Sequence, residues 1–311
     1  ARVDLLYNGG IGTYGKSSPE EKSDEGDRAN DRVRANGNQL RCRVFGEGGN
    51  LGATQRGRIE FWTNGGPGHT DAIDNSGGVD MSDHEVNIKI LLDVLLRQGV
   101  VADRASRNAI IAEMTDEVSE LVLADNIGQS LALTLDGMRS AAAYEAWVDL
   151  VEGFVADGIV NRKDAALPTK EALLASPARD RGLPRPVLCV LMGHVKNWAF
   201  AQGLQTPLPD SEVARPLLDA YFPKRLRAEF AAHFPSHPLK REIIATVAVN
   251  SIINHAGISF VSRLMRDTKA DLGRILTTYL EVEQACGAQA VRAALAAQGR
   301  TAQDERLVRL A

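Results

Sequence analysis

Cysteine is scarce in this sequence, and the few cysteines are not placed to pair. Cys42, Cys189 and Cys286 lie far apart along a chain of 311 residues. This spacing excludes a disulfide framework and the C-x-x-C pairs that hold zinc. We therefore expect a protein of the reducing cytoplasm.

Long apolar runs and metal-binding spacings are also missing. No run approaches the ~20 residues that a membrane span requires, and no signal peptide is recognisable. The pair His84 and Glu85 is followed by Ile88, where a zinc-binding H-E-x-x-H helix needs a second histidine. We expect neither a membrane partner nor a metal site.

Neither sign of charge is in large excess. The 36 Lys and Arg residues against 40 Asp and Glu residues give a net charge of −4, so the charge does not favour nucleic acid as a partner. The apolar content of 44% and the charged content of 24% are those of a globular protein. A chain of this length suits about two domains.

The first part of the chain contains short apolar runs that end in glycine. Residues 3–10, 40–50 and 70–78 each predict a strand followed by a tight turn, and residues 54–62 predict a short helix. This order is typical of a parallel α/β sheet, in which ligands bind at the carboxyl ends of the strands. Because a strand follows almost directly after Ala1, we expect the chain to begin inside a domain.

Beyond the third predicted strand, the apolar residues repeat with the period of a helix. Ile88, Leu91 and Leu95 share one helical face, and no later segment has the pattern of a strand. The predicted fold class is therefore α/β followed by all-α. We place the α/β domain at residues 1–98 and the helical domain at residues 99–311.

A G-x-G-x-x-G motif follows the first predicted strand, at Gly10, Gly12 and Gly15. In a dinucleotide-binding fold this motif opens a helix that packs on the sheet, and an acidic residue ends the next strand. The residues after Gly15 are polar, include Pro19 and have no apolar face. The motif is therefore interpreted as a flexible turn rather than a phosphate site.

Polar residues near the predicted strand ends have two interpretations each. Ser82 and Glu85 form an S-x-x-E capping box, and the glycines before them also leave backbone N–H groups where an anion can bind. Glu47 fits either a general base or part of a tight turn. Asn50 and Asn75 follow predicted strands, where asparagine is common in turns.

Two motifs, taken in order, give the sequence a family resemblance. E-G-G-N at 47–50, followed by D-N-S-G-G-V-D-M-S-D-H-E at 74–85, resembles the glutamate dehydrogenase pattern E-G-A-N … N-A-G-G-V-x-x-S-x-x-E. The segments around these motifs, and later ones such as REIIATVAVNSIINHAGISFVSRL, are similar to the large bacterial NAD-specific glutamate dehydrogenases. The resemblance implies the C-terminal part of a Rossmann-like parallel-sheet domain joined to a large helical domain.

The resemblance also implies an activity and a set of site residues. The family oxidises L-glutamate to 2-oxoglutarate and ammonia, with NAD as cofactor. By position, the nicotinamide end of NAD is bordered by Gly9, Gly10, Asn50 and Asn75. The carbon chain of the substrate is contacted by Val79, and its distal carboxylate by the hydroxyl of Ser82.

Other parts of such an enzyme are expected outside this chain. The catalytic lysines and aspartate of the family, and its phosphate-binding glycines, are implied upstream of Ala1. No catalytic residue is therefore assigned, and the chain alone is expected to be inactive. Gly49 and Ser76 stand where shorter members of the family have alanine, and we expect both changes to matter little.

Two alternatives stay open. One is a non-catalytic helical assembly or regulatory module that carries a partial nucleotide-binding domain. The other is a dehydrogenase for branched or aromatic amino acids, against which the hydroxyl of Ser82 argues, because an apolar pocket has no use for it. For the full-length enzyme we expect a homo-oligomer.

Overall fold

The computed structural model describes residues 2–21 and 28–301. The chain packs as two compact units, each built from two segments. The first unit is Ala1–Ser82 with Val122–Val195, and the second unit is Asp83–Leu121 with Lys196–Ala311. The predicted boundary after residue 98 concerns the domains of the family and stays a prediction.

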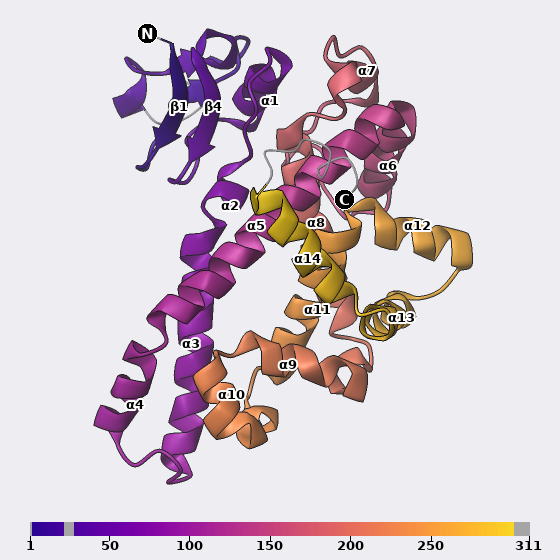
Figure 1. The fold of residues 1–311 in the computed structure, drawn as a ribbon. Coiled ribbons are helices and arrows are strands. Elements are labelled where there is room, and N and C mark those ends of the chain that lie inside the picture. Colours follow the sequence, from indigo (N-terminus) through magenta and orange to yellow (C-terminus); the bar gives the residue numbers. More distant parts are fainter. Residues whose placement is uncertain (1, 22–27, 302–311) are drawn as a thin grey trace. The chain divides into compact units, whose positions relative to one another are not determined.

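The sheet of the first unit has two neighbouring parallel strands (Figure 1). β1 (Val3–Asn8) pairs with β4 (Cys42–Glu47) in a register that places Asn8 beside Glu47. The strands predicted within residues 3–10 and 40–50 are therefore confirmed. Because the strands are parallel, their carboxyl ends lie side by side.

Helices make up most of the remaining chain. In chain order they are α1 (Gln55–Thr63), α2 (Asp71–Asp74), α3 (Ser76–Arg97), α4 (Arg104–Ala112), α5 (Thr115–Ala142), α6 (Tyr144–Ala156), α7 (Lys170–Leu174), α8 (Arg185–Gly203), α9 (Arg215–Tyr221), α10 (Lys224–Phe230), α11 (Lys240–Ala256), α12 (Ser259–Thr268), α13 (Leu272–Ala285) and α14 (Ala288–Thr301).

Shorter elements connect these helices and strands. They are the parallel pair β2 (Gly15–Lys16) and β3 (Ala35–Asn36), and the 3-10 turns η2 (Arg28–Asn30), η3 (Gly37–Gln39), η4 (Arg179–Arg181), η5 (Leu208–Asp210), η6 (Glu212–Ala214) and η7 (Ala231–Ser236). Within residues 28–301 no strand follows β4. The coarse prediction, a small parallel sheet followed by helices, is confirmed.

The helix predicted at residues 54–62 is confirmed as α1. Thr54 caps it, because its hydroxyl oxygen accepts a hydrogen bond from the Gly57 amide at 2.9 Å. Phe61 on the buried face of α1 meets Phe45 of β4 edge to face, with ring centroids 6.2 Å apart. This contact packs the helix against the sheet.

The strand predicted at residues 70–78 is wrong. These residues form α2 and the start of α3, with Asn75 between them. Asp71 and Asp74 place negative charge in a first helical turn, where the helix dipole favours it. The run between these carboxylates holds only two apolar residues, too few for a strand of a covered parallel sheet.

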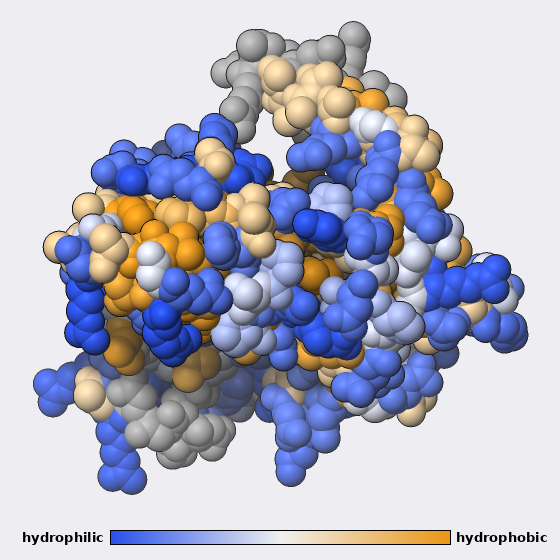
Figure 2. All heavy atoms as spheres, turned by 90° about the horizontal axis from the view of Figure 1, so that it is seen from below, coloured by the Kyte–Doolittle hydropathy of each residue, from blue (hydrophilic) through white to orange (hydrophobic). Residues whose placement is uncertain are grey.

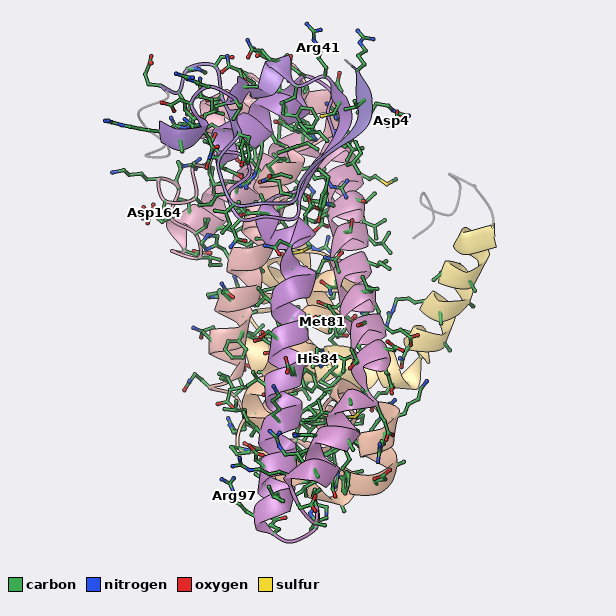
Figure 3. All side chains as sticks on the ribbon, turned by 90° about the vertical axis from the view of Figure 1, so that its left-hand side faces the viewer. Asp4, Arg41, Met81, His84, Arg97 and Asp164 are labelled. Atoms are coloured by element: carbon green, nitrogen blue, oxygen red, sulfur yellow. The ribbon has the colours of Figure 1, made fainter. Side chains whose placement is uncertain are left out.

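The capping box predicted at Ser82 is wrong as well. α3 begins at Ser76, so Ser82 lies inside the helix between Met81 and His84, which Figure 3 labels, and its side chain is exposed. Ser76, the first residue of α3, makes the side-chain hydrogen bonds at the start of the helix instead. Its hydroxyl donates to the Ile73 carbonyl at 3.0 Å and accepts from Asn126 Nδ2 at 2.8 Å. The serine at position 76 is therefore not equivalent to alanine, contrary to expectation.

Apolar packing holds the second unit. Ile88, Leu91 and Leu95 line the predicted face of α3 and are at most 3% exposed. α11 adds a second buried row that includes Ile252 and Ile253. Polar side chains cover much of the face shown in Figure 2, with apolar atoms between them.

Across the described residues, 2–21 and 28–301, no single helix is long and apolar enough to cross a membrane. By length and composition alone, the bent pair α11 and α12 passes the same test together, with 92° between the two helices.

Candidate functional site

The carboxyl ends of β1 and β4 carry two glycine turns that touch each other. β1 continues into Gly9 and Gly10, and β4 continues into Gly48 and Gly49. The Gly49 amide donates to the Asn8 carbonyl at 3.0 Å. A Cβ on Gly49 would lie 2.2 Å from the Gly10 carbonyl oxygen, so a larger residue requires the backbone to shift. The expectation that alanine and glycine are interchangeable at position 49 is wrong for this chain.

The two asparagines predicted at the nicotinamide end are brought together. Asn75 Nδ2 donates to Asn50 Oδ1 at 2.5 Å. Asn50 is exposed in the turn after β4, and Asn75 lies at the junction of α2 and α3. Leu51, directly after Asn50, has a φ of 57°, which is unfavourable for a leucine. Contacts from outside the turn must therefore stabilise this conformation.

The two predicted substrate residues lie on one face of α3. Val79 and Ser82 are three residues apart, so their side chains are neighbours on the helix. Both are exposed, Val79 by 63%. Asn75 lies directly before α3, four residues before Val79. The structure thus brings Asn50 and Asn75 into contact and places Val79 and Ser82 on the helix that follows, and the binding roles of all six residues stay predictions.

A buried ion pair supports the turn after β4. The Glu47 carboxylate is fully buried and accepts from Arg58 at 2.6 and 2.7 Å and from the Ala53 amide at 3.0 Å. Arg58 also donates to Asp71 Oδ1 at 3.0 Å. Glu47 is thus engaged within the protein, which agrees with the tight-turn interpretation and not with a general base that faces a ligand.

Burial and pairing act on the pKa of both partners of this ion pair. Burial raises the pKa of the Glu47 carboxyl by more than the hydrogen bond from Arg58 lowers it. Burial lowers the pKa of the Arg58 guanidinium, but the Glu47 and Asp71 carboxylates outweigh that effect and raise it overall. Arg58 therefore stays a cation in the interior.

α2 supports the same turn with two carboxylates. Asp71 Oδ2 accepts from the Leu51 amide at 2.8 Å, and Asp74 Oδ2 accepts from the Glu47 amide at 2.9 Å. Asp74 Oδ1 lies 2.8 Å from His69 Nδ1. Sequence reasoning missed this set. The available signal was a pair of aspartates three residues apart, the second of which is the first residue of the family motif.

Other polar groups of the first unit are engaged deeper in the fold. Arg185 donates to the Ser130 carbonyl at 3.1 Å and to Thr134 Oγ1 at 2.7 Å, and burial lowers the pKa of its guanidinium. Burial also raises the pKa of the Cys189 thiol to about 12. Cys189 is therefore a protonated core residue at neutral pH and not a nucleophile.

Two histidines of the second unit, His84 and His237, lie in its core. His237 donates from Nε2 to the Asn87 carbonyl at 3.0 Å and accepts at Nδ1 from the Leu239 amide at 3.0 Å. His84 stacks on Tyr221 with ring centroids 4.2 Å apart. Among the residues that the structure describes, no group of three His, Cys, Asp or Glu side chains is arranged to hold a metal ion.

Comparison with known proteins identifies the family. Residues 1–136 match the family model for the catalytic domain of bacterial NAD-glutamate dehydrogenase, and residues 180–311 match the model for the C-terminal part of glutamate dehydrogenase. The NAD-specific glutamate dehydrogenase of Mycobacterium tuberculosis is 44% identical over 92% of this chain. The chain belongs to the bacterial NAD-specific glutamate dehydrogenase family.

Two further NAD-specific glutamate dehydrogenases are similarly related. That of Halomonas elongata is 42% identical over 90% of this chain, and that of Pseudomonas aeruginosa is 42% identical over 91%. The chain spans only 17–18% of the length of these three relatives. All six predicted site residues fall within the match to the catalytic-domain model.

Proposed function

We propose that this chain supplies the nicotinamide edge of an NAD site, and one anchor for glutamate, within a longer NAD-specific glutamate dehydrogenase. Such an enzyme deaminates L-glutamate oxidatively to 2-oxoglutarate and ammonia. The proposal rests on the hydrogen bond between Asn75 and Asn50, which joins two motifs 25 residues apart. This contact lies at the carboxyl ends of parallel strands, the edge at which α/β sheets bind ligands.

The residues at this edge fit the nicotinamide half of NAD. A Cβ on Gly10 would meet nothing within 4 Å, so the turn leaves open space in front of its backbone. The side-chain amides of Asn50 and Asn75 offer donors and acceptors suited to a carboxamide and a ribose. When bound, NAD accepts a hydride from the α-carbon of the substrate. The part of this chain is to orient that end of the cofactor.

Val79 and Ser82 are the residues that we assign to the substrate. The exposed side chain of Val79 suits the carbon chain of glutamate. Ser82, one turn further along the same face, offers a hydroxyl donor for the distal carboxylate. No proton transfer is assigned to either residue. The catalytic lysines and aspartate belong to the portion of the enzyme that this chain does not span.

The β1–β4 pair is best explained as the end of a larger Rossmann-like sheet. Successive residues of a strand point to opposite faces, and Leu5 and Leu6 of β1 are 56% and 41% exposed. Strands that are apolar on both faces are typical of parallel sheets covered on both sides. This supports a Rossmann-like part at residues 1–98 and a helical domain at residues 99–311.

The full-length enzyme is proposed to be a cytoplasmic homo-oligomer without nucleic acid or membrane as partner. The net charge of −4 gives no attraction to polyanions, and the three cysteines are free. In the first unit, α5 exposes Leu123, Ile127 and Leu131, which are spaced four residues apart. An exposed apolar row of this kind suits contact with another subunit.

Ser82→Ala in the full-length enzyme tests the proposed function. It removes a charge-assisted hydrogen bond worth roughly 1.5–3 kcal/mol, so we expect about a ten- to hundredfold loss in kcat/KM for glutamate. Because Ser82 is exposed inside α3 and does not cap it, alanine should leave the melting temperature unchanged or slightly higher. Steady-state NADH formation and thermal unfolding measure the two effects.

Two variants serve as controls. Ser119→Ala on α5 removes a hydroxyl that only donates back to the Thr115 carbonyl at 3.0 Å, and should leave kcat/KM unchanged. Ser82→Asp should repel the substrate carboxylate and reduce activity further. If Ser82→Asp binds glutamate as well as the parent does, the substrate role is wrong, and the non-catalytic helical module becomes the better explanation.

A further inference from the structure

We propose that Asp71 and Asp74 are positioning residues that hold Asn50 beside Asn75, a role that rests on the proposed function of this edge. Both aspartates lie on the four-residue helix α2, three residues apart, and Asn75 follows α2 directly as its C-cap. A backbone amide that donates a hydrogen bond to either carboxylate is therefore held at a fixed position relative to Asn75. Neither aspartate has to touch a ligand to have this effect.

Each carboxylate binds one backbone amide of the turn that carries Asn50. Asp71 accepts from the Leu51 amide at 2.8 Å, directly after Asn50, and Asp74 accepts from the Glu47 amide at 2.9 Å, before it. The turn is thus held on both sides of the asparagine. Leu51 has a φ of 57°, which leucine rarely adopts, so the bond from its amide to Asp71 stabilises an unfavourable conformation.

The second oxygen of each carboxylate is engaged by a side chain. Arg58 Nη2 donates to Asp71 Oδ1 at 3.0 Å, and His69 Nδ1 lies 2.8 Å from Asp74 Oδ1. The side chains of Asp71 and Asp74 are only 17% and 20% exposed, so water competes little for these contacts. Asparagine in either place keeps the size but has a single, uncharged acceptor oxygen. At position 71 one of the two contacts is therefore lost, and at position 74 the charge-assisted bond from the Glu47 amide becomes a weaker, neutral one.

Ligand titrations of the full-length enzyme test the positioning role. The probes are NADH and ADP, which shares the adenosine and the pyrophosphate but has neither the nicotinamide nor its ribose. We expect Asp71→Asn and Asp74→Asn each to weaken NADH binding about five- to tenfold, the effect of losing or weakening one hydrogen bond, and to leave ADP binding unchanged. If both ligands are weakened equally, the substitutions have merely loosened the domain and the proposal is overturned.

Asp149→Asn is the matched control for these substitutions. Asp149 lies in the first unit, is 65% exposed and pairs with Lys170 at 2.7 Å, away from the turn after β4. This variant should change the affinity for neither probe. A loss of NADH affinity in Asp149→Asn equal to that in Asp71→Asn would make the effect one of charge alone and would overturn the proposal.

A substitution at Leu51 tests whether Asp71 acts by holding the backbone of the turn. Leu51→Asn supplies a residue that tolerates a positive φ, and Leu51 is 63% exposed, so little packing is lost. In the Asp71→Asn background it should restore part of the lost NADH affinity. No recovery means that Asp71 does not act by holding this turn.

Asn50→Ala separates this proposal from the proposed function. If Asn50→Ala leaves NADH binding unchanged, the function assigned to the edge fails, and the positioning role fails with it. If Asn50→Ala weakens NADH binding but Asp71→Asn and Asp74→Asn do not, only the positioning role fails. Weakening by all three variants, with no further loss when Asn50→Ala and Asp71→Asn are combined, supports both.

Discussion

The strand ends of the first unit and the helical core of the second unit are stabilised by opposite means. At the strand ends, Glu47 and Arg58 are 0% and 7% exposed, and carboxylates bind the backbone amides of the turn. In the second unit, the most buried positions of α3 and α11 are aliphatic, such as Leu91 and Ile252. Apolar side chains can repack after small shifts, whereas a carboxylate bound to an amide fixes two particular atoms, as a ligand site requires.

The charges at the strand ends are not explained by stability alone. Each buried ion loses hydration worth several kcal/mol, which the attraction between the ions offsets only when the geometry is good. The Glu47 and Arg58 pair meets that condition with two hydrogen bonds of 2.6 and 2.7 Å. The benefit is a turn with a single conformation, and the cost is high sensitivity to the loss of either partner.

Among the variants that test this comparison, Arg58→Met should cause the largest loss of stability. It leaves the fully buried Glu47 carboxylate without its cation, and an uncompensated buried charge costs about 3–5 kcal/mol. Urea unfolding of the chain, followed by circular dichroism, measures the loss. Adding Glu47→Gln removes the charge and should recover part of the stability. Equal stability of Arg58→Met and the parent would show that the pair is not buried in solution.

Ile252→Ala tests the apolar side of the comparison. Ile252 is fully buried on α11, and removing its side chain should cost about 2–5 kcal/mol through lost burial and a cavity. Val282→Ala on α13 is the control, since Val282 is 53% exposed and its loss should change stability by less than about 0.5 kcal/mol. Similar losses in both variants would contradict a core centred on α11.

Gly49→Ala probes the close contact between the two strand-end turns. Its Cβ would lie 2.2 Å from the Gly10 carbonyl oxygen, so the backbone must shift, at a cost of about 1–3 kcal/mol. Gly153→Ala is the matched control, because Gly153 lies inside α6 with nothing within 4 Å of the added Cβ. That control should gain up to about 1 kcal/mol of stability. If both variants are stabilised, the turns do not touch.

The parts that could be predicted from the sequence are those with a repeating local signal. The apolar row Ile88, Leu91 and Leu95 has the helical period and is buried, and glycine follows both strands as expected. α2 is only four residues long, too short to show a helical period, so the sequence pattern predicts a strand there instead. That error also moved the predicted helix start from Ser76 to Ser82.

The candidate site likewise has one part that could be predicted from the sequence and one part that could not. The order of the family motifs predicted that Asn50 and Asn75 belong together, and their side chains are in contact. The support beneath them could not be predicted, because Asp71 reaches the Leu51 amide across twenty residues of sequence and leaves no local pattern. Contacts of this kind depend on how the elements pack rather than on the period of any one of them.

The smallest expected effect is a pH dependence that originates in the second unit. Burial lowers the pKa of His237, and the hydrogen bond to the Asn87 carbonyl and the charge of Glu242 oppose this only in part. The neutral ring accepts from the Leu239 amide at Nδ1, a contact that protonation removes. In the unfolded chain, histidine titrates near its usual pKa of ~6.5.

Between that value and the lower folded-state pKa, the unfolded chain binds more protons than the folded chain. The stabilising contribution of neutral His237 is therefore fully present above ~6.5 and decreases as the pH falls toward the folded-state pKa. Urea unfolding at steps between about pH 7.5 and pH 5 should show this decrease in the parent. In His237→Gln, which keeps a donor for Asn87 without titrating, the decrease should be shallower. Parallel profiles for the two proteins would mean that His237 has the same pKa in both states and that its burial does not affect the stability of the second unit.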